Sequence, residues 1–407
     1  MQVDVFATTV GNMGMLPGTE GFVAVSFSLR FFIVALSAWL IGIIVGVQYL
    51  SVRTSFLVVT VKIAIVVLYA TVLADGSWYT GGDDWGYVLR SVDLYLKNVN
   101  PLAIWFTPEG QHLHAYPNSA LLKWYNSSLF YVFGPSYYVG LMFFPALSMI
   151  TGAFVVRLLR SSGLTELSSQ IGVIFYLLHW DTITWTSFLN LKEPIVTCLL
   201  FFALFGASLI PRNIFSSMAI IGTSFFAFQK IRFYFPFLLT AGICLSILSH
   251  YCNRVSVKHL IVATVGGIGV IGIALATKLI NWSQILYAAQ LAEPESLAYG
   301  FAKTLLSPLP WNLTAPAEYL LICSTLHLIL LPLTLTGAWL LFRTSFTGKL
   351  IVSVWFVSLA AYAVQPMVLS PRHLAPVRAL EILMQFQALL VVFELYWDNI
   401  SGSYGRK

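Results

Sequence analysis

Long apolar runs, most of them close to the length of a membrane-spanning helix, recur along the chain between short polar stretches. A hydrocarbon core about 30 Å thick needs about 20 apolar residues of helix to cross it. Only helices and closed barrels can span lipid, and these runs are too long and continuous for the tilted strands of a barrel. The pattern therefore predicts an all-α polytopic membrane protein, with a single transmembrane domain over residues 1–407.

The apolar runs predict about eleven transmembrane helices. They cover residues 24–50, 55–74, 136–158, 170–189, 195–210, 214–229, 233–249, 259–280, 319–342, 350–369 and 375–396. The short pieces around 195–249 could instead form tight hairpins or half-spans. The two longest stretches between spans, about residues 75–135 and 281–318, are expected to be loops.

Composition supports the membrane prediction and excludes other classes. The chain is 58% hydrophobic and 9% charged, whereas soluble domains carry about 25% charged residues. The net charge of +6 fits the basic rims of a membrane protein, and no basic stripe indicates a nucleic-acid partner. No metal-ligand spacing is present among the cysteines, so we interpret them as packing residues. They are Cys198, Cys244, Cys252 and Cys323.

Lysine and arginine in the short loops predict the orientation, because cytoplasmic loops are enriched in both. The residues expected on the cytoplasmic side are Arg53, Arg157, Arg160, Arg212, Arg254, Lys258, Arg343, Lys349, Arg406 and Lys407. The opposite side also carries basic residues, but these lie beside long loops and span ends that contain Asp, His, Trp and Pro. We therefore expect both long loops on the extracytoplasmic side of a cell (inner) membrane.

Two adjacent carboxylates, Asp83 and Asp84, follow the second predicted span in the stretch WYTGGDDWGYVLRS. The residues after them predict a short juxtamembrane helix with an interfacial pattern. Its apolar and aromatic positions at helical spacing are Trp85, Val88, Val92 and Tyr95, and Asp93 falls on a different face. One of the two carboxylates could cap this helix by accepting backbone N–H bonds. The other is then available near the membrane surface as a general base.

Two further stretches place charges at predicted span ends on the same side. NLKEP brings Lys192 and Glu193 to a span boundary. They form either a charged turn or a phosphate site in which Glu193 orients Lys192. FQKIRF interrupts an apolar run with Lys230 and Arg232, which are either functional or reach the interface by snorkelling.

Histidines and arginines add further candidates on the extracytoplasmic side. PRHLAPVR places Arg372, His373 and Arg378 at the outer end of the last span, where the two arginines could clamp a phosphate. EGQHLHAYP adds His112 and His114 to the loop that holds the Asp pair. A two-His site with an Asp would hold a divalent metal, so a metal cofactor stays open. The alternative is that these two histidines line the acceptor side or sit in solvent.

An acidic loop and several basic clusters at the level of the outer leaflet indicate chemistry on a lipid-linked phosphate. The expected donor is a polyprenyl-phosphate sugar, whose tail stays in the bilayer. The leaving phosphate needs Arg or Lys nearby, and the acceptor hydroxyl needs a carboxylate base.

The order of these motifs resembles the GT-C membrane glycosyltransferases, the superfamily that includes dolichyl-phosphate-mannose protein mannosyltransferases and bacterial relatives. GGDDWGYVLR is similar to the Asp motif of an early extracytoplasmic loop, and NLKEP to a Lys–acid pair at a span boundary. IRFYFPFLL, LSPLPW and PRHLAP are similar to later segments, so the resemblance covers roughly residues 55–380. The chain departs from the family in an additional span at 24–50 and in having KE where KD is more frequent.

The resemblance implies an inverting transfer in which Asp84, or Asp83 beside it, deprotonates an acceptor hydroxyl. That hydroxyl attacks the anomeric carbon, and polyprenyl phosphate leaves. The residues that the resemblance implies at the donor phosphate are Lys192, Arg232, Arg372 and Arg378. The expected partners are the lipid-linked donor, membrane lipid and an acceptor that is a glycan, a lipid or a protein.

Two other classes stay open. A polymerase or ligase for lipid-linked polysaccharide repeat units would also have many spans and outer arginines, but it would depend on basic residues rather than on an early Asp pair. A transporter or lipid flippase would show internal repeats and mid-membrane charges on broken helices. We find no repeat, and among the basic residues that we single out, only Lys62 lies away from a predicted span end.

Overall fold

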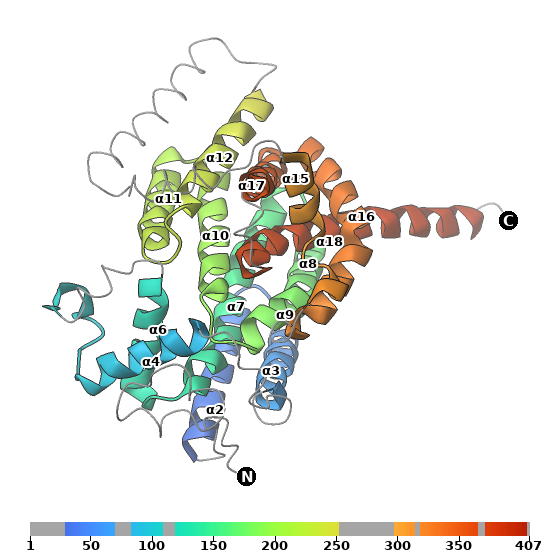
Figure 1. The fold of residues 1–407 in the computed structure, drawn as a ribbon. Coiled ribbons are helices and arrows are strands. Elements are labelled where there is room, and N and C mark those ends of the chain that lie inside the picture. The colour runs from blue at the N-terminus through green and yellow to red at the C-terminus, as the bar shows by residue number, and fades with distance from the viewer. Residues whose placement is uncertain are drawn as a thin grey trace.

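The structure is a computed structural model that describes residues 29–69, 83–108, 119–251, 297–313, 318–364 and 371–404. These ranges form α-helices and short 3-10 helices, and no β-strand occurs within them, which confirms the all-α prediction (Figure 1). The longer helices are α2 (Leu29–Gly46), α3 (Val52–Leu68), α4 (Asp83–Leu96), α6 (Ala120–Phe133), α7 (Tyr137–Ser161), α8 (Glu166–Leu178), α9 (Trp180–Ser187), α10 (Glu193–Ser208), α11 (Ile214–Gln229), α12 (Phe235–Tyr251), α15 (Leu297–Leu306), α16 (Leu321–Thr344), α17 (Phe346–Ala363) and α18 (Pro371–Tyr404). The 3-10 helices are η3 (Ile104–Phe106), η6 (Pro310–Asn312) and η7 (Glu318–Leu320).

Five of the described helices are long and apolar enough to cross a membrane, so the chain is a helical membrane protein. They are α2, α7, α16, α17 and the part of α18 from Arg372 to Glu394. The described helices do not support a count of eleven spans, because α8, α10, α11 and α12 are 13 to 17 residues long. The span expected at 259–280 lies outside the described residues.

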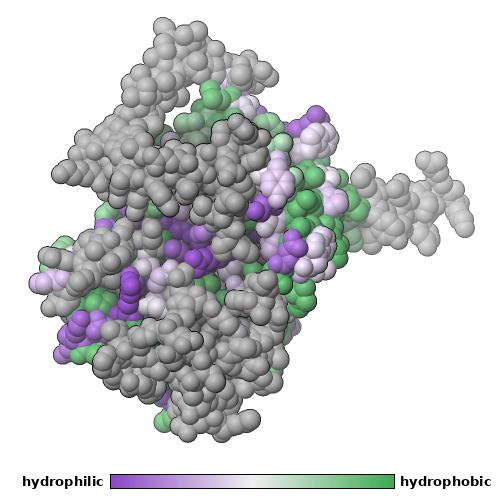
Figure 2. All heavy atoms as spheres, viewed as in Figure 1, coloured by the Kyte–Doolittle hydropathy of each residue, from purple (hydrophilic) through white to green (hydrophobic). Residues whose placement is uncertain are grey.

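Helices α7 and α18 form the centre of the bundle, and other helices cover them. Most side chains of α7 are buried, and α7 packs against α2, α6, α8, α9 and α10. Helix α18 packs against α8, α9, α10, α16 and α17. By contrast, α2 and α16 expose large apolar side chains such as Phe32, Ile44 and Ile329, as expected of helices that face lipid. Figure 2 shows apolar surface on the side where α16 lies in Figure 1.

The predicted span at 170–189 is wrong in one respect, because it breaks into α8 and α9 at His179, whose backbone is extended. A break frees carbonyl oxygens at the end of the first helix. The buried Lys62 of α3 meets this need, since its Nζ donates to the carbonyl oxygen of Leu177 at 3.1 Å and to Thr186 Oγ1 at 3.1 Å. An ammonium at a helix C-terminus also favours the helix dipole.

Helix α4 exists where the sequence predicts it, and one of its faces packs into the protein. Val88 and Val92 are fully buried in the main core, and α4 packs on α6. The Ser91 hydroxyl donates to the carbonyl oxygen of Tyr87 at 2.7 Å, and its oxygen lies 3.3 Å from the carbonyl oxygen of Lys123 on α6. Asp93 lies on a different face, as expected, where it pairs with Lys97 at 2.8 Å.

A glycine sets the contact between α16 and α18. A Cβ at Gly337 would overlap the backbone carbonyl of Met384, whereas a Cβ at Gly222 on α11 would meet nothing within 4 Å. Small residues let helix backbones approach in a membrane. We expect Gly337→Ala to destabilise the protein by about 1–3 kcal/mol, the usual cost of overpacking. Thermal unfolding in detergent checks this, with Gly222→Ala as the matched control that should unfold at the wild-type temperature or above; equal unfolding temperatures for both variants would contradict the close contact.

Candidate functional site

The predicted basic residues meet where three segments converge: the start of α10, the loop between α11 and α12, and the start of α18. Glu193 is the first residue of α10, and Arg372 is the second residue of α18. Arg232, in the loop, forms an ion pair with Glu193, and both side chains are buried. Arg232 Nη2 also donates to the backbone oxygen of Arg372, at 3.4 Å, which joins the loop to the start of α18.

Two tyrosines extend this arrangement across to α17. Arg232 Nη1 donates to the Tyr234 hydroxyl at 2.7 Å, and the Tyr234 and Tyr362 oxygens lie 3.3 Å apart. The Tyr362 hydroxyl donates to the backbone oxygen of His373 at 3.1 Å. Because Tyr362 uses its hydrogen on a carbonyl, its oxygen accepts from Tyr234. We call the side chains of Glu193, Arg232, Tyr234 and Tyr362, with the backbone of Arg372 and His373, the Arg232 cluster.

The guanidinium of Arg232 stays charged within the Arg232 cluster. Burial by itself would lower the pKa of Arg232, but the neighbouring Tyr234 and Glu193 raise that pKa above its ordinary value. Glu193 offsets this one positive charge; Lys192 precedes Glu193 in the chain, and the backbone oxygen of Arg372 contacts Arg232, so two further basic residues adjoin the cluster. The N-termini of α10 and α18 add the positive ends of two helix dipoles. The site therefore favours an anion such as a phosphate.

Helix α4 reaches the same region through Tyr87. Lys192 Nζ lies 6.0 Å from the centre of the Tyr87 ring, close enough for a cation–π contact. Asp83 and Asp84 are the first two residues of α4, and residues three or four apart on a helix are neighbours. The start of α4 is thus near the start of α10, although the side chains of Asp83 and Asp84 lie outside the described residues. Both lie in the first turn, where carboxylates are favourable.

Lys230, two residues before Arg232, turns away from the Arg232 cluster. Its Nζ lies 6.0 Å from the Trp105 ring and 5.9 Å from the Phe226 ring. Its carbonyl oxygen accepts from the backbone N–H of Leu121, which ties the loop to the start of α6. On α6, burial and the nearby Arg90 lower the pKa of Lys123 to about 8.

Arg378 belongs to a second, separate cluster deeper along α18. Its Nη1 lies 2.7 Å from Glu381 Oε2 and 2.8 Å from His327 Nδ1, and its Nη2 donates to the carbonyl oxygens of residues 304, 305 and 307. Trp355 Nε1 donates to Glu381 Oε1 at 2.9 Å. His327 Nε2 faces the carbonyl oxygen of Leu305 at 2.7 Å, so this nitrogen carries the hydrogen and Nδ1 accepts from Arg378. The two terminal nitrogens of Arg378 are thus engaged within the protein.

The structure brings together the side chains of Glu193 and Arg232 with the backbone of Arg372 and His373, and Lys192 precedes Glu193 in the chain. It assigns Arg378 to another cluster. His112 and His114, and with them the metal hypothesis, lie outside the described residues. Within the described ranges, no group of three His, Cys, Asp or Glu side chains could hold a metal ion. Arg157 and Lys349, both expected on the cytoplasmic side, lie at helix ends opposite those of the Arg232 cluster: Arg157 lies over the Phe205 ring, and Lys349 donates to the Ser249 carbonyl oxygen.

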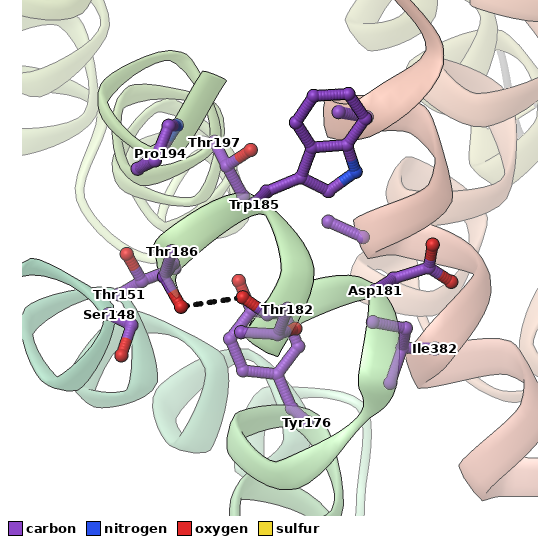
Figure 3. A pocket seen from close by; sticks show the side chains of 12 residues that line it. Ser148, Thr151, Tyr176, Asp181, Thr182, Trp185, Thr186, Pro194, Thr197 and Ile382 are labelled. Atoms are coloured by element: carbon purple, nitrogen blue, oxygen red, sulfur yellow. Dashed lines mark hydrogen bonds between the residues drawn. The ribbon is translucent and has the colours of Figure 1, made fainter. Parts of the chain in front are cut away.

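Sequence reasoning missed Tyr234, Tyr362, Asp181 and Glu381. Two of these left a signal, because Asp181 and Glu381 are carboxylates inside predicted spans, and ionisable residues within membrane helices are expensive and are usually functional or paired. Asp181 lies on α9 beside a small pocket between α7, α8, α9, α10 and α18 (Figure 3). No protein-family model, curated protein or solved structure matches this chain.

Proposed function

We propose that this protein is an inverting glycosyltransferase that moves a sugar from a polyprenyl-phosphate donor to a hydroxyl of an extracytoplasmic acceptor. The observation that carries the proposal is the Arg232 cluster, together with Lys192 and Arg372 beside it. Three segments far apart in the sequence, which carry Lys192, Arg232 and Arg372, meet at one end of the bundle, where α10 and α18 begin. Such a setting stabilises a phosphate, and stabilises it more as negative charge develops on it.

In the proposed step, Asp84, or Asp83 beside it, takes the proton of the acceptor hydroxyl. The hydroxyl oxygen forms a bond to the anomeric carbon from the face opposite the phosphate. The bond between that carbon and the phosphate oxygen breaks, and its electron pair leaves with polyprenyl phosphate. Lys192, Arg232 and Arg372 offset the charge on the leaving phosphate, and Glu193 holds Arg232 in place. The contact between Lys192 and Tyr87 supports the nearness of α4 to the phosphate site.

The test is a transfer assay with radiolabelled polyprenyl-phosphate sugars in membranes that contain the full-length protein. We expect label to move to an acceptor, polyprenyl phosphate to be released in equal amount, and the new linkage to have the opposite anomeric configuration. Membranes without the protein are the control. No turnover of any polyprenyl-phosphate sugar, with growth of pyrophosphate-linked oligosaccharides instead, would replace the proposal with a repeat-unit polymerase.

A further inference from the structure

Helix α15 is only 10 residues long and lies beside α17 (Figure 1). A helix of this length is about 15 Å long, which is about half of a hydrocarbon core. A Cβ at Gly300 would overlap the backbone oxygen of Ala363, so the two backbones touch at the end of α17. The next residue, Phe301, contacts Phe356 further back along α17, with 6.0 Å between the ring centres.

The C-terminal end of α15 is held by the buried side chains of Arg378 and His327. Arg378 Nη2 donates to the carbonyl oxygens of Thr304 and Leu305, both at 3.2 Å, and to that of Ser307. The Leu305 oxygen also accepts from His327 Nε2 at 2.7 Å. His327 and Arg378 lie in the second turns of α16 and α18, about 10 Å from the starts of these helices. Helix α15 therefore enters the bundle at the end that carries the Arg232 cluster and stops part of the way through it.

A helix that ends inside a membrane leaves its last carbonyl oxygens without partners, and lipid cannot supply them. Arg378 and His327 meet this need for α15, as Lys62 does for α8. An arginine within a membrane is costly and usually functional, and here Glu381 compensates its charge at 2.7 Å. A buried ion pair at the place where α15 ends indicates that a half-length helix in this position has a role.

The face of α15 that points away from these contacts is apolar. Tyr299, Ala302 and Leu306 recur at positions i, i+3 and i+7, the spacing of a single helix face. All three are exposed, with Tyr299 at 66% and Leu306 at 37%. Lys303 borders this face, and a lysine side chain is long enough to reach the polar edge of a membrane. A face of this composition, on a helix that runs into a membrane protein from its end, is suited to contact with hydrocarbon chains.

The apolar face of α15 begins beside the Arg232 cluster. Gly300, which follows Tyr299, touches Ala363, which follows Tyr362 of the cluster. Leu306 lies two turns further along α15, about 10 Å deeper. A lipid phosphate at the cluster carries its hydrocarbon chain directly on the phosphate, and that chain must run from the level of the cluster into the membrane.

The exposed face of α15 follows the same course from the same starting point. We propose that this face, formed by Tyr299, Ala302 and Leu306, holds the first isoprene units of the polyprenyl chain of the donor, and that Arg378 positions α15 for this contact. This inference rests on the proposed function.

Photocrosslinking of the full-length protein in nanodiscs tests the inference without depending on turnover. The photoreactive amino acid p-benzoylphenylalanine replaces Tyr299, and the probe is a trace of radiolabelled polyprenyl phosphate in phosphatidylcholine. We expect irradiation to label the protein, and an excess of unlabelled polyprenyl phosphate to remove most of the label. An equal excess of phosphatidylglycerol, which is also anionic but has ordinary acyl chains, should leave the label in place.

The matched control carries the same photoreactive residue in place of Phe32, an aromatic residue in the first turn of α2 that is 58% exposed and lies far from α15 (Figure 1). The Tyr299 variant should take up about tenfold more label than the Phe32 variant, which corresponds to about 1.4 kcal/mol of preference.

Equal labelling of the two variants, or label that phosphatidylglycerol also removes, would show contact with ordinary membrane lipid and overturn the inference. Sugar transfer that proceeds while the Tyr299 variant takes up no label would overturn the inference alone and leave the proposed function standing. Specific label at Tyr299 without transfer of any sugar would support the lipid contact and count against the proposed function instead.

Discussion

Asp84→Asn is expected to lower sugar transfer from a polyprenyl-phosphate donor by about 10²–10⁴-fold, the usual contribution of a general base. The amide keeps the shape of the carboxylate but cannot take the proton of the acceptor hydroxyl. Asp84 is the second residue of α4, and the first turn of α4 lies near the start of α10 through Tyr87 and Lys192. The affinity for the donor should change little, because the cations that hold its phosphate are intact.

The matched control is Asp93→Asn on the same helix, where the native carboxylate makes only an exposed pair with Lys97. Exposed pairs contribute about 0–1 kcal/mol, so both stability and transfer should stay near wild type. Asp83→Asn, assayed beside them, decides which of the adjacent carboxylates is the base. If both Asp83→Asn and Asp84→Asn insert normally and keep full transfer, neither carboxylate is the base. The pair would then serve only to stabilise the start of α4, and the polymerase alternative would be favoured.

Glu193→Ala is expected to destabilise the protein by about 3–5 kcal/mol, because it leaves the Arg232 guanidinium buried without its partner. Both side chains are buried almost completely, so water cannot take over the lost ion pair. The double variant Glu193→Leu with Arg232→Met removes both charges and fills the space with apolar groups. Such replacements are often neutral or stabilising, so this variant should unfold near the wild-type temperature.

The double variant separates a structural role of the pair from a functional one. Under the proposed function, it should be folded and inserted but should release polyprenyl phosphate far more slowly, because a cation at the phosphate is gone. Thermal unfolding in detergent and the transfer assay measure the two properties on one preparation. A stable double variant with wild-type transfer would show that Arg232 serves only to join the loop to α10.

Several features of the chain follow from local sequence. The apolar runs predict helices α2, α7, α16 and α17 close to their observed bounds, because burial in lipid or protein depends on hydropathy summed over each segment. The position of α4 is also predictable, since its apolar residues recur at helical spacing. The short loops near Lys192, Arg232 and Arg372 stand out because charge is rare in so apolar a chain.

Local sequence does not decide which of these charges meet. Glu193 and Arg232 are 39 residues apart, and Arg232 lies 140 residues from the carbonyl of Arg372 that it contacts. Arg372 and Arg378 look equivalent in PRHLAPVR, yet Arg378 turns to Glu381 and His327 instead. The helix break at His179 is equally invisible in hydropathy, because Lys62, far away in the sequence, supplies the hydrogen bond that makes the break tolerable.

The sequence by itself determined that the chain is helical and membrane-embedded, and which few polar positions could carry chemistry, because hydropathy and periodicity act within each segment. Only the tertiary structure decided the pairing of charges, the breaking of one predicted span and the small pocket beside it. Those features arise where helix ends from different parts of the chain pack together, and packing depends on the fit between side chains that no single segment contains.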